Sequence, residues 1–240
     1  MKKKEIRDLI YVSKSQREAN CFYSYGIEFY EFMNGVSNRP ENLILLKHDF
    51  HNENWNQHSR FDYVTKEEIN ELIEDNVNRY GDFVWVDFSK EADLDTLSSN
   101  DIAELLFFSH LARPLTRIPK IRFAYHSHDD GWFNKLYVSD LKDYEDLLAN
   151  VIPAKLRKLT GRKMNDIPQV VASALLENTN DGLFIDLSRL IKSRAELKIP
   201  ITTIGHFTDM DKVYDFRDEV REYKLWLVYS QKLWKLIKED

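Results

Sequence analysis

The sequence contains little glycine, and its glycines are widely spaced. Seven glycines are spread over 240 residues, and no two of them are closer than nine positions. Glycine-rich phosphate-binding loops such as GxGxxG and the Walker loop are absent, and neither HExxH nor a nucleophile elbow occurs. The sequence therefore carries no local signature of the nucleotide-binding or hydrolase classes that these motifs mark.

Cysteine and long apolar runs are also scarce. Cys21 is the only cysteine, so an internal disulfide is ruled out and a reducing cytoplasm is the expected compartment. The basic start MKKKEIRDLIYV contains an apolar run, LIYV, that is far too short for a secretory signal. No stretch approaches the roughly 20 apolar residues that span a bilayer. We predict a soluble, cytoplasmic protein with no membrane partner.

Acidic residues outnumber basic ones. The 34 lysines and arginines stand against 40 aspartates and glutamates, for a net charge of −6. This balance lacks the positive footprint of general nucleic-acid binding, so we predict no nucleic-acid partner. A basic cluster, KLRKLTGRK (155–163), stands where a helix is expected to end at Gly161. Cations there complement the helix dipole, with a local anion site as the alternative.

The order of predicted elements indicates an α+β fold. Strands and helices alternate early, but a β-hairpin at 121–138 then interrupts them, which predicts a mixed or antiparallel sheet with flanking helices. We expect a single domain over 1–240, with a sub-boundary at 160–166 as the alternative. The tail at 224–237 is rich in β-formers and favours a closing hairpin over a continued helix.

The remaining elements follow from hydrophobic periodicity and from capping residues. The aromatic segment 25–33 favours a strand, with a short helix as the alternative. Asn100 or Ser99 is expected to cap one of the helices. The other predicted elements are strands at 9–12, 43–50, 83–88 and 199–207, and helices at 65–80, 98–115, 140–159, from Asp166 onward and at 210–222.

The hairpin contains the most suggestive stretch, FAYHSHDDGWF (123–133). A two-residue turn at Asp130-Gly131 would place His126 opposite Lys135. Because side chains alternate along strands, the two faces can be assigned. The apolar face, expected in the core, carries Ile121, Phe123, Tyr125, Leu136 and Val138. The other face carries Arg122, Ala124, His126, His128, Phe133, Lys135 and Tyr137.

The two histidines permit a metal interpretation. His126 and His128 lie roughly 7 Å apart along the strand, so their imidazoles could converge on one ion. HxHxD resembles the start of the HxHxDH ligand run of metallo-hydrolases, but Gly131 stands at the last position. Further ligands would be His206 and Asp209, or the loop histidines His48, His51 and His58.

Charge on the same face favours a different interpretation of the hairpin. Lys135 opposite His126, and Arg122 nearby, disfavour the entry of another cation. We therefore favour a structural or solvent-facing hairpin, and no cofactor is predicted. A divalent metal is the alternative.

Aromatic residues favour a binding role. They make up 13% of the chain, and aromatic side chains at a surface supply binding area. The expected exposed aromatics are Tyr23, Tyr25, Trp55, Trp132 and Phe133. The candidate binding residues are Trp55, His126, His128, Asp129, Asp130 and Trp132.

Three functions remain open from the residues alone. The favoured one is a binding protein for a partner protein or small ligand. The alternatives are a metal-dependent hydrolase centred on His126 and His128, and a sensor or inhibitor whose acidic surface suits a basic partner. Whether any reaction is catalysed is left open.

Several segments together resemble a group of uncharacterised soluble proteins from Gram-positive bacteria. These segments are YSYGIEFYEF, LLKHDF with the following RFDYV, YGDFVWVDF, IAELLFFSHL, FAYHSHDDGWFNKLY and IPITTIGHFTDMD. Some members carry the label oxalate:formate antiporter, a transporter class that needs many membrane helices. This chain has no such apolar stretch, so the label does not fit it. The resemblance implies a cytoplasmic protein and assigns no catalytic residue.

Overall fold

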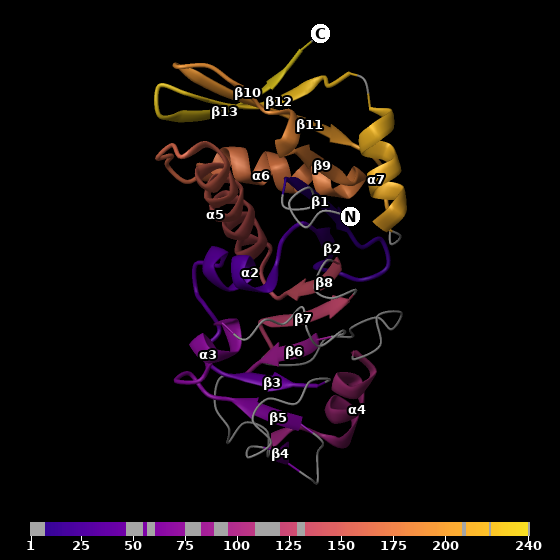
Figure 1. The fold of residues 1–240 in the computed structure, drawn as a ribbon. Coiled ribbons are helices and arrows are strands. Elements are labelled where there is room, and N and C mark those ends of the chain that lie inside the picture. Colours follow the sequence, from indigo (N-terminus) through magenta and orange to yellow (C-terminus); the bar gives the residue numbers. More distant parts are fainter. Residues whose placement is uncertain are drawn as a thin grey trace.

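The structure is a computed structural model that describes residues 8–46, 55–56, 61–74, 83–88, 96–108, 121–128, 133–207, 210–220 and 222–239. Within these ranges the polypeptide forms one long sheet that runs the length of the molecule, with helices on both sides (Figure 1). No helix in the described ranges is both long and apolar enough to cross a membrane.

In the described part of the chain thirteen strands form the sheet, and every pairing between them is antiparallel. The predicted α+β class with an antiparallel sheet is therefore confirmed. The order is β13-β12-β11-β9-β1-β2-β8-β7-β6-β3-β5-β4, and β10 pairs with β11. The strands are β1 Leu9–Lys14, β2 Cys21–Tyr25, β3 Leu43–Leu45, β4 Trp55–Asn56, β5 Phe61–Val64, β6 Phe83–Asp87, β7 Phe123–His128, β8 Phe133–Val138, β9 Leu183–Asp186, β10 Ile191–Lys192, β11 Glu196–Thr203, β12 Leu225–Ser230 and β13 Leu233–Lys238.

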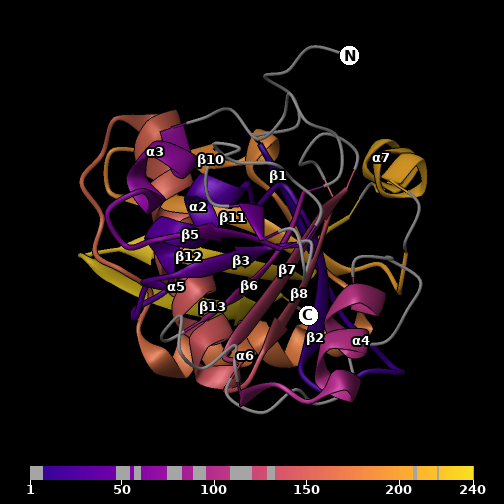
Figure 2. The ribbon, with the colours of Figure 1, turned by 90° about the horizontal axis from the view of Figure 1, so that it is seen from below.

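The helices divide between the two sides of the sheet (Figures 1 and 2). The α-helices are α2 Phe29–Gly35, α3 Ile69–Glu74, α4 Ser99–Phe108, α5 Leu141–Thr160, α6 Gln169–Asn178 and α7 Met210–Glu219, and the short 3-10 turns are η3 Thr179–Asp181 and η4 Leu187–Arg189. We call the side covered by α2, α3, α5 and α6 the α5 face. The opposite side, which carries α4 and α7, is the α4 face.

The α5 face holds the main core. Buried side chains of the central strands, such as Phe22, Trp85 and Leu136, pack against Leu148 and Ile152 of α5 in one continuous cluster. Burying a large apolar side chain stabilises a fold by roughly 1.5–3 kcal/mol. Of the residues predicted for the apolar side of the hairpin, those at 123, 125, 136 and 138 lie in this cluster, whereas Ile121 lies in the smaller cluster with Leu105 and Phe108, so its predicted side is wrong. Arg122, predicted for the other side, instead pairs with Asp143 of α5.

Helix α5 begins and ends where the sequence predicts. Asp140 accepts a hydrogen bond from the amide of Lys142, and Gly161 ends the helix in the left-handed conformation with φ of 69°. Glycine adopts this conformation without the steric penalty of a side chain. The helix also contains Pro153, whose ring nitrogen cannot donate to the carbonyl of Ala149. The amide of Ile167 donates to that carbonyl instead, at 3.1 Å.

The predicted closing hairpin at 224–237 is present. Strands β12 and β13 are joined by Gln231 and Lys232, both of which have positive φ angles, 51° and 63°. Two successive positive φ angles are the mark of a type I′ turn, which matches the twist of paired strands.

Two local predictions differ from the structure. The segment 25–33 is mainly helical, because α2 starts at Phe29 and Glu28 forms a capping box with Glu31. The residue that precedes α4 is Ser98, whose Oγ accepts from the amide of Asp101 at 3.2 Å. The predicted caps Asn100 and Ser99 lie inside that helix.

Candidate functional site

The hairpin has the predicted register. His126 pairs with Lys135, Tyr125 with Leu136, and Ser127 with Asn134. His126 and Lys135 therefore project side by side on the α4 face. Both side chains lie under α4. The centre of the Phe108 ring of that helix is 6.2 Å from the centre of the His126 imidazole and 5.6 Å from the Lys135 ammonium.

This side of the hairpin was predicted to be structural or solvent-facing, and its centre is structural and not solvent-facing. His126 and Lys135 are each only 1% exposed, and Phe133 is equally buried. The strand pattern fixes which residues share a face, but Phe108 of α4 packs on His126 and Lys135, and Glu18 pairs with Lys135, so this face is covered too. Among the described hairpin residues, 121–128 and 133–138, only His128 at the end of β7 is exposed.

A buried ion pair occupies the middle of the α4 face. The Lys135 ammonium lies 2.6 Å from a carboxylate oxygen of Glu18, with both side chains nearly inaccessible. The hydroxyl of Tyr23 donates to the other oxygen of Glu18 at 3.2 Å. Burial and the nearby Glu18 carboxylate raise the pKa of Tyr23 to about 12. Burial, again with Glu18, raises the pKa of Cys21 to about 12, which makes this thiol a poor nucleophile.

His206 lies on the same face but away from the hairpin histidines. Its Nδ1 is 2.5 Å from the Oγ of Ser13 on β1. The hydroxyl of Tyr11 holds the backbone on both sides of His206, because it donates to the Gly205 carbonyl at 2.8 Å and accepts from the Phe207 amide at 2.7 Å. Three inter-strand steps separate β1 from β7, roughly 14 Å at the usual strand spacing.

The structure therefore brings His126 and His128 together, with ring centroids 6.4 Å apart, and does not bring His206 beside them. Among the described residues no group of three or more His, Cys, Asp or Glu side chains is arranged to hold a metal ion. The predicted residues Asp129, Asp130, Trp132 and Asp209, the loop histidines His48, His51 and His58, and the side chain of Trp55 lie outside the described residues. The metal site stays a prediction.

The predicted exposed aromatics are mostly not exposed where the structure describes them. Tyr25 and Phe133 are each 1% exposed, so this part of the prediction is wrong. Tyr25 packs edge-on against Tyr214 of α7, and Phe133 stacks on Tyr23. Tyr23 itself is partly exposed. These rings fill the space between the sheet and its covering elements.

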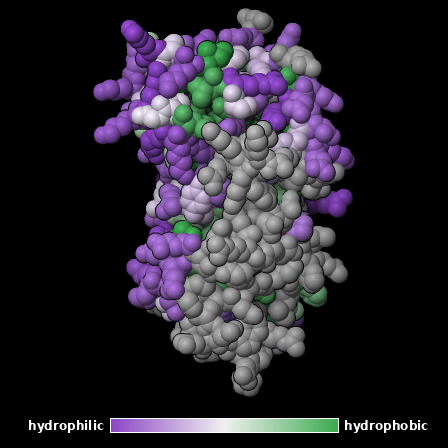
Figure 3. Space-filling model, viewed as in Figure 1, coloured by the Kyte–Doolittle hydropathy of each residue, from purple (hydrophilic) through white to green (hydrophobic). Residues whose placement is uncertain are grey.

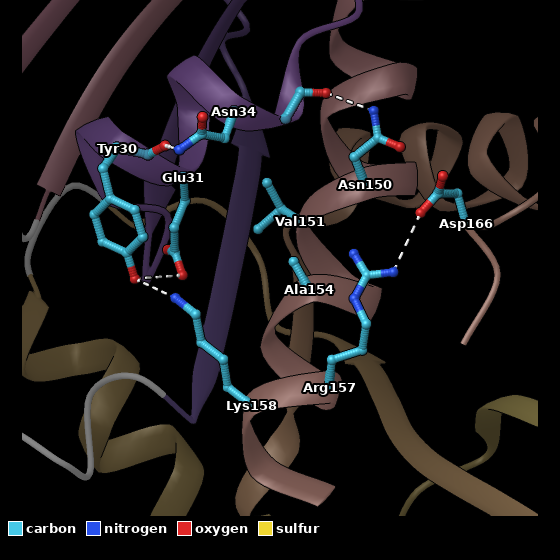
Figure 4. A pocket seen from close by; sticks show the side chains of 10 residues that line it. Tyr30, Glu31, Asn34, Asn150, Val151, Ala154, Arg157, Lys158 and Asp166 are labelled. Carbon is cyan, nitrogen blue, oxygen red and sulfur yellow. Dashed lines mark hydrogen bonds and ion pairs between the residues drawn. The ribbon is translucent and has the colours of Figure 1, made fainter. Parts of the chain in front are cut away.

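A pocket lies elsewhere, between α2 and α5 (Figure 4). It encloses about 450 Å³. Val151 and Ala154 of α5 form an apolar floor, and the ring of Tyr30 stands on the α2 side. The two helices approach closely beside it, because a β-carbon at Gly35 would come within 2.7 Å of Val151 and 2.8 Å of Leu147. The pocket is lined by Tyr30, Glu31, Asn34, Gly35, Asn150, Val151, Ala154, Arg157, Lys158 and Asp166.

A second buried ion pair borders this pocket. Glu31 and Lys155 lie 2.8 Å apart, and their side chains are 7% and 4% exposed. The same carboxylate also accepts from the Glu28 amide at 3.0 Å and from the Tyr30 hydroxyl at 3.2 Å. Because these partners satisfy Glu31, its charge is balanced within the protein.

Two cations from the basic cluster face the pocket. Lys158 is exposed, donates to the Tyr30 hydroxyl at 2.8 Å and lies 4.6 Å above the Tyr30 ring. Arg157 donates to the Met164 carbonyl at 3.0 Å and lies 3.6 Å from Asp166. Since Asp166 balances Arg157, Lys158 gives this end of the pocket an excess of positive charge. The anion-site alternative for residues 155–163 thus has a cavity beside it.

Two amides and a helix irregularity complete the pocket wall. Asn34 donates to the Tyr30 carbonyl and Asn150 to the Gly35 carbonyl, at 2.7 and 2.6 Å. Their side-chain oxygens can still accept hydrogen bonds from a ligand. Because Pro153 has no amide hydrogen to donate, the Ala149 carbonyl accepts from the Ile167 amide instead. This hydrogen bond places the adjacent Asp166 at the edge of the pocket.

Sequence reasoning did not identify this pocket. One signal was available on α5, where Asn150, Ala154 and Arg157 follow the i, i+4, i+7 spacing of one helical face. The other wall could not be found, because the segment 25–33 favours a strand, with a short helix only as the alternative, and no sequence pattern pairs α2 with α5.

Comparison with known proteins adds no assignment. No protein-family model matches the chain. No curated protein and no solved structure matches it either.

Proposed function

We propose that this protein binds a small molecule that has a carboxylate group and an apolar or aromatic body. The observation that carries the proposal is the α2–α5 pocket, with its apolar floor, its aromatic wall and its exposed lysine. Small-molecule sites are commonly cavities of about 300–1,000 Å³ with apolar linings and a few placed polar groups. The volume of this pocket lies in that range, and Val151, Ala154 and the Tyr30 ring supply its apolar part, while most of its other lining residues are polar or charged.

The charge distribution supports an anionic ligand. Glu31 is paired with Lys155, and Asp166 lies near Arg157, so Lys158 is the cation of this pocket that forms no ion pair with a carboxylate among the described residues. A carboxylate at this position would gain a charge-assisted hydrogen bond from the ammonium, which is stronger than one between neutral groups. The rest of the ligand would lie on Val151 and Ala154, against the Tyr30 ring.

We propose that the whole chain is one domain, which the continuous sheet supports. We also propose a cytoplasmic location, which the buried single thiol of Cys21 supports.

Calorimetric titration with benzoate tests the binding function. Benzoate is expected to bind to the wild-type protein, and uncharged benzyl alcohol is expected to bind at least about tenfold more weakly because it lacks the ionic contact. Ala154→Trp fills the pocket and should abolish benzoate binding. Lys158→Gln should weaken it by about tenfold, the equivalent of roughly 1.4 kcal/mol.

Two variants of the same helix serve as controls. Leu159→Trp adds an indole at an exposed position outside the pocket lining, and Lys142→Gln removes a charge near the start of α5. Both should bind benzoate within about twofold of the wild type, a difference of about 0.4 kcal/mol. Equal binding by Ala154→Trp, or no benzoate binding by the wild type, would contradict the proposal.

A further inference from the structure

The C-terminal strand is at an edge of the sheet. β13 is the last strand in the sheet order and pairs with β12 alone among the described strands. An edge strand presents unpaired amides and carbonyls and is a template for another strand. Partner proteins use such edges by adding an extended segment, whose backbone supplies affinity and whose side chains supply specificity.

The register shows which backbone groups of β13 point outward. Leu233 pairs with Ser230 across the two-residue turn, which makes this closing pair hydrogen-bonded. At the other end of the strand, the amide of Glu239 donates to the carbonyl of Lys224 at 2.8 Å, so the same alternation of inward and outward backbone groups holds there. The odd-numbered positions 233–239 therefore point toward β12. The backbone groups of Trp234, Leu236 and Lys238 point away from it.

The side chains along this edge are apolar and basic. Leu233 is 59% exposed and Ile237 is 40% exposed, and Lys235 stands between them on the α4 face. Lys235, Val228, Lys198 and Ile191 follow one another across four paired strands. In Figure 3 the end of the molecule that carries β10–β13 shows a hydrophobic strip among hydrophilic residues.

The charge of this end is opposite to that of the chain. We define the C-terminal sheet end as residues 191–203 and 222–239. It contains seven lysines and arginines against three glutamates, a balance of +4, whereas the whole chain carries −6. The rest of the chain therefore carries −10. A partner that meets this end gains from negative charge, and it gains from apolar side chains at Leu233 and Ile237.

These observations select one occupant. A second copy of the chain would bring two ends of charge +4 together, and lysines on edge strands oppose such self-pairing. We propose that β13 docks an extended acidic segment of a partner protein, which adds to the sheet as a further strand beyond β13. Its glutamates or aspartates would face Lys235, and its backbone would pair with Trp234, Leu236 and Lys238.

Peptide binding to the full chain tests this surface. The probe is a fluorescein-labelled eight-residue peptide in which glutamate alternates with valine, measured by fluorescence anisotropy. It should bind at least about tenfold more tightly than a peptide with lysine in place of glutamate, because the charges then repel. Its affinity should fall as salt is raised from about 50 to about 500 mM, since exposed charges are screened.

Variants separate the charge contribution from the backbone contribution. Lys235→Glu should weaken binding of the acidic peptide by about tenfold, and the matched variant Lys212→Glu on α7 by less than about twofold. Lys238→Pro removes an outward amide while leaving the β12 pairing intact, as edge strands tolerate. It should weaken binding more than Lys238→Gln, which removes the charge alone.

Four results of the binding and association measurements would each overturn the proposal. The first two are equal affinity for the lysine peptide and the acidic peptide, and unchanged affinity for the acidic peptide in Lys235→Glu. The third is a concentration-dependent dimer that dissociates in Lys238→Pro. The fourth is binding to phosphatidylserine vesicles without binding to the acidic peptide. Hydrogen exchange gives the direct readout of strand addition. The acidic peptide should slow exchange at the amides of Leu236 and Lys238, and unchanged exchange there would also overturn it.

Discussion

The two faces of the sheet differ in what they bury. The α5 face holds one continuous apolar cluster that runs from Ile10 to Trp234. The α4 face holds two smaller apolar clusters, one around Leu105 and Phe108 and one around Tyr11 and Val213. Between these two clusters lies a polar row whose strand register is continuous. Its members are Ser13, Tyr23, Lys135 and His126.

This difference indicates a division of roles. Apolar burial on the α5 face supplies most of the stability, because the free energy scales with apolar area removed from water. The polar row on the α4 face must instead offset the desolvation of its charges by pairing them. The α2–α5 pocket lies at the surface of the better packed side, where a rigid wall can position its polar groups.

The largest expected effect comes from a cavity on the α5 face. Leu148→Ala should lower the free energy of unfolding by about 3–4 kcal/mol, since the side chain is fully buried among rigid neighbours. Leu105→Ala, equally buried in the smaller α4 cluster, should cost about 2 kcal/mol because that cluster can relax more easily. Urea denaturation measures both. A larger loss for Leu105→Ala would break the comparison.

Breaking the ion pair on the α4 face should have the next largest effect. Lys135→Met leaves the Glu18 carboxylate buried without its ammonium, and we expect a loss of about 3 kcal/mol at pH 7.

The double variant Lys135→Met with Glu18→Gln is the control for this prediction. It removes both charges and should recover at least about half of the lost stability, since a buried neutral pair avoids the desolvation of an unpaired ion. Urea denaturation of both proteins at pH 7 gives the comparison. No recovery would show that packing of the lysine stem, and not its charge, holds this part of the α4 face.

A carboxyl group on the α5 face supplies a pH-dependent test. Burial raises the pKa of Asp87 to about 6, against hydrogen bonds from the Phe123 and Arg122 amides that lower it. Folding therefore favours the protonated acid. The contribution of Asp87 to the free energy of unfolding is fully present below about pH 4, the pKa of this group in the unfolded chain. It is lost as the pH rises through about 6, its pKa in the folded protein.

Asp87→Asn should flatten this dependence, because its amide oxygen can still accept from the two backbone amides. Between pH 4 and pH 6.5 the wild type should lose about 1–2 kcal/mol more than the variant, after allowance for partial solvent screening. Urea titrations across this range give the comparison. Parallel curves for the two proteins would remove Asp87 as the cause.

The smallest expected effect concerns the hydrogen bond that Pro153 makes available. Pro153→Ala restores a helical amide that competes for the Ala149 carbonyl, so the Ile167 amide should lose its acceptor. Hydrogen exchange at Ile167 should become about tenfold faster, equivalent to about 1.4 kcal/mol of local opening. Unchanged exchange would mean that the α5–α6 connection is held by other contacts.

Much of the fold follows from local sequence signals. The alternation of 123–128 and 133–138 gives the correct register and faces, because the side-chain period of a strand is two. Asp140 and Gly161 mark the ends of α5 because capping is a short-range interaction. The hairpin at Gln231 and Lys232 was also predictable, from the β-formers on either side.

The burial of the second face and the pocket could not be predicted in the same way. Whether His126 meets solvent depends on where α4 lies, and that is a contact between segments distant in sequence. Lys135 of β8 pairs with Glu18, which precedes the neighbouring strand β2, and Glu31 of α2 pairs with Lys155 of α5. No spacing rule connects these residues.

Chemical-shift mapping with benzoate tests the central claim most directly. On the isotope-labelled wild-type protein, we expect saturable shifts at the backbone amides of Asn34, Asn150 and Ala154, and none of these in Ala154→Trp. Saturable shifts confined to the polar row around His126 and Tyr23, or shifts that Ala154→Trp retains, would contradict a small-molecule site between α2 and α5.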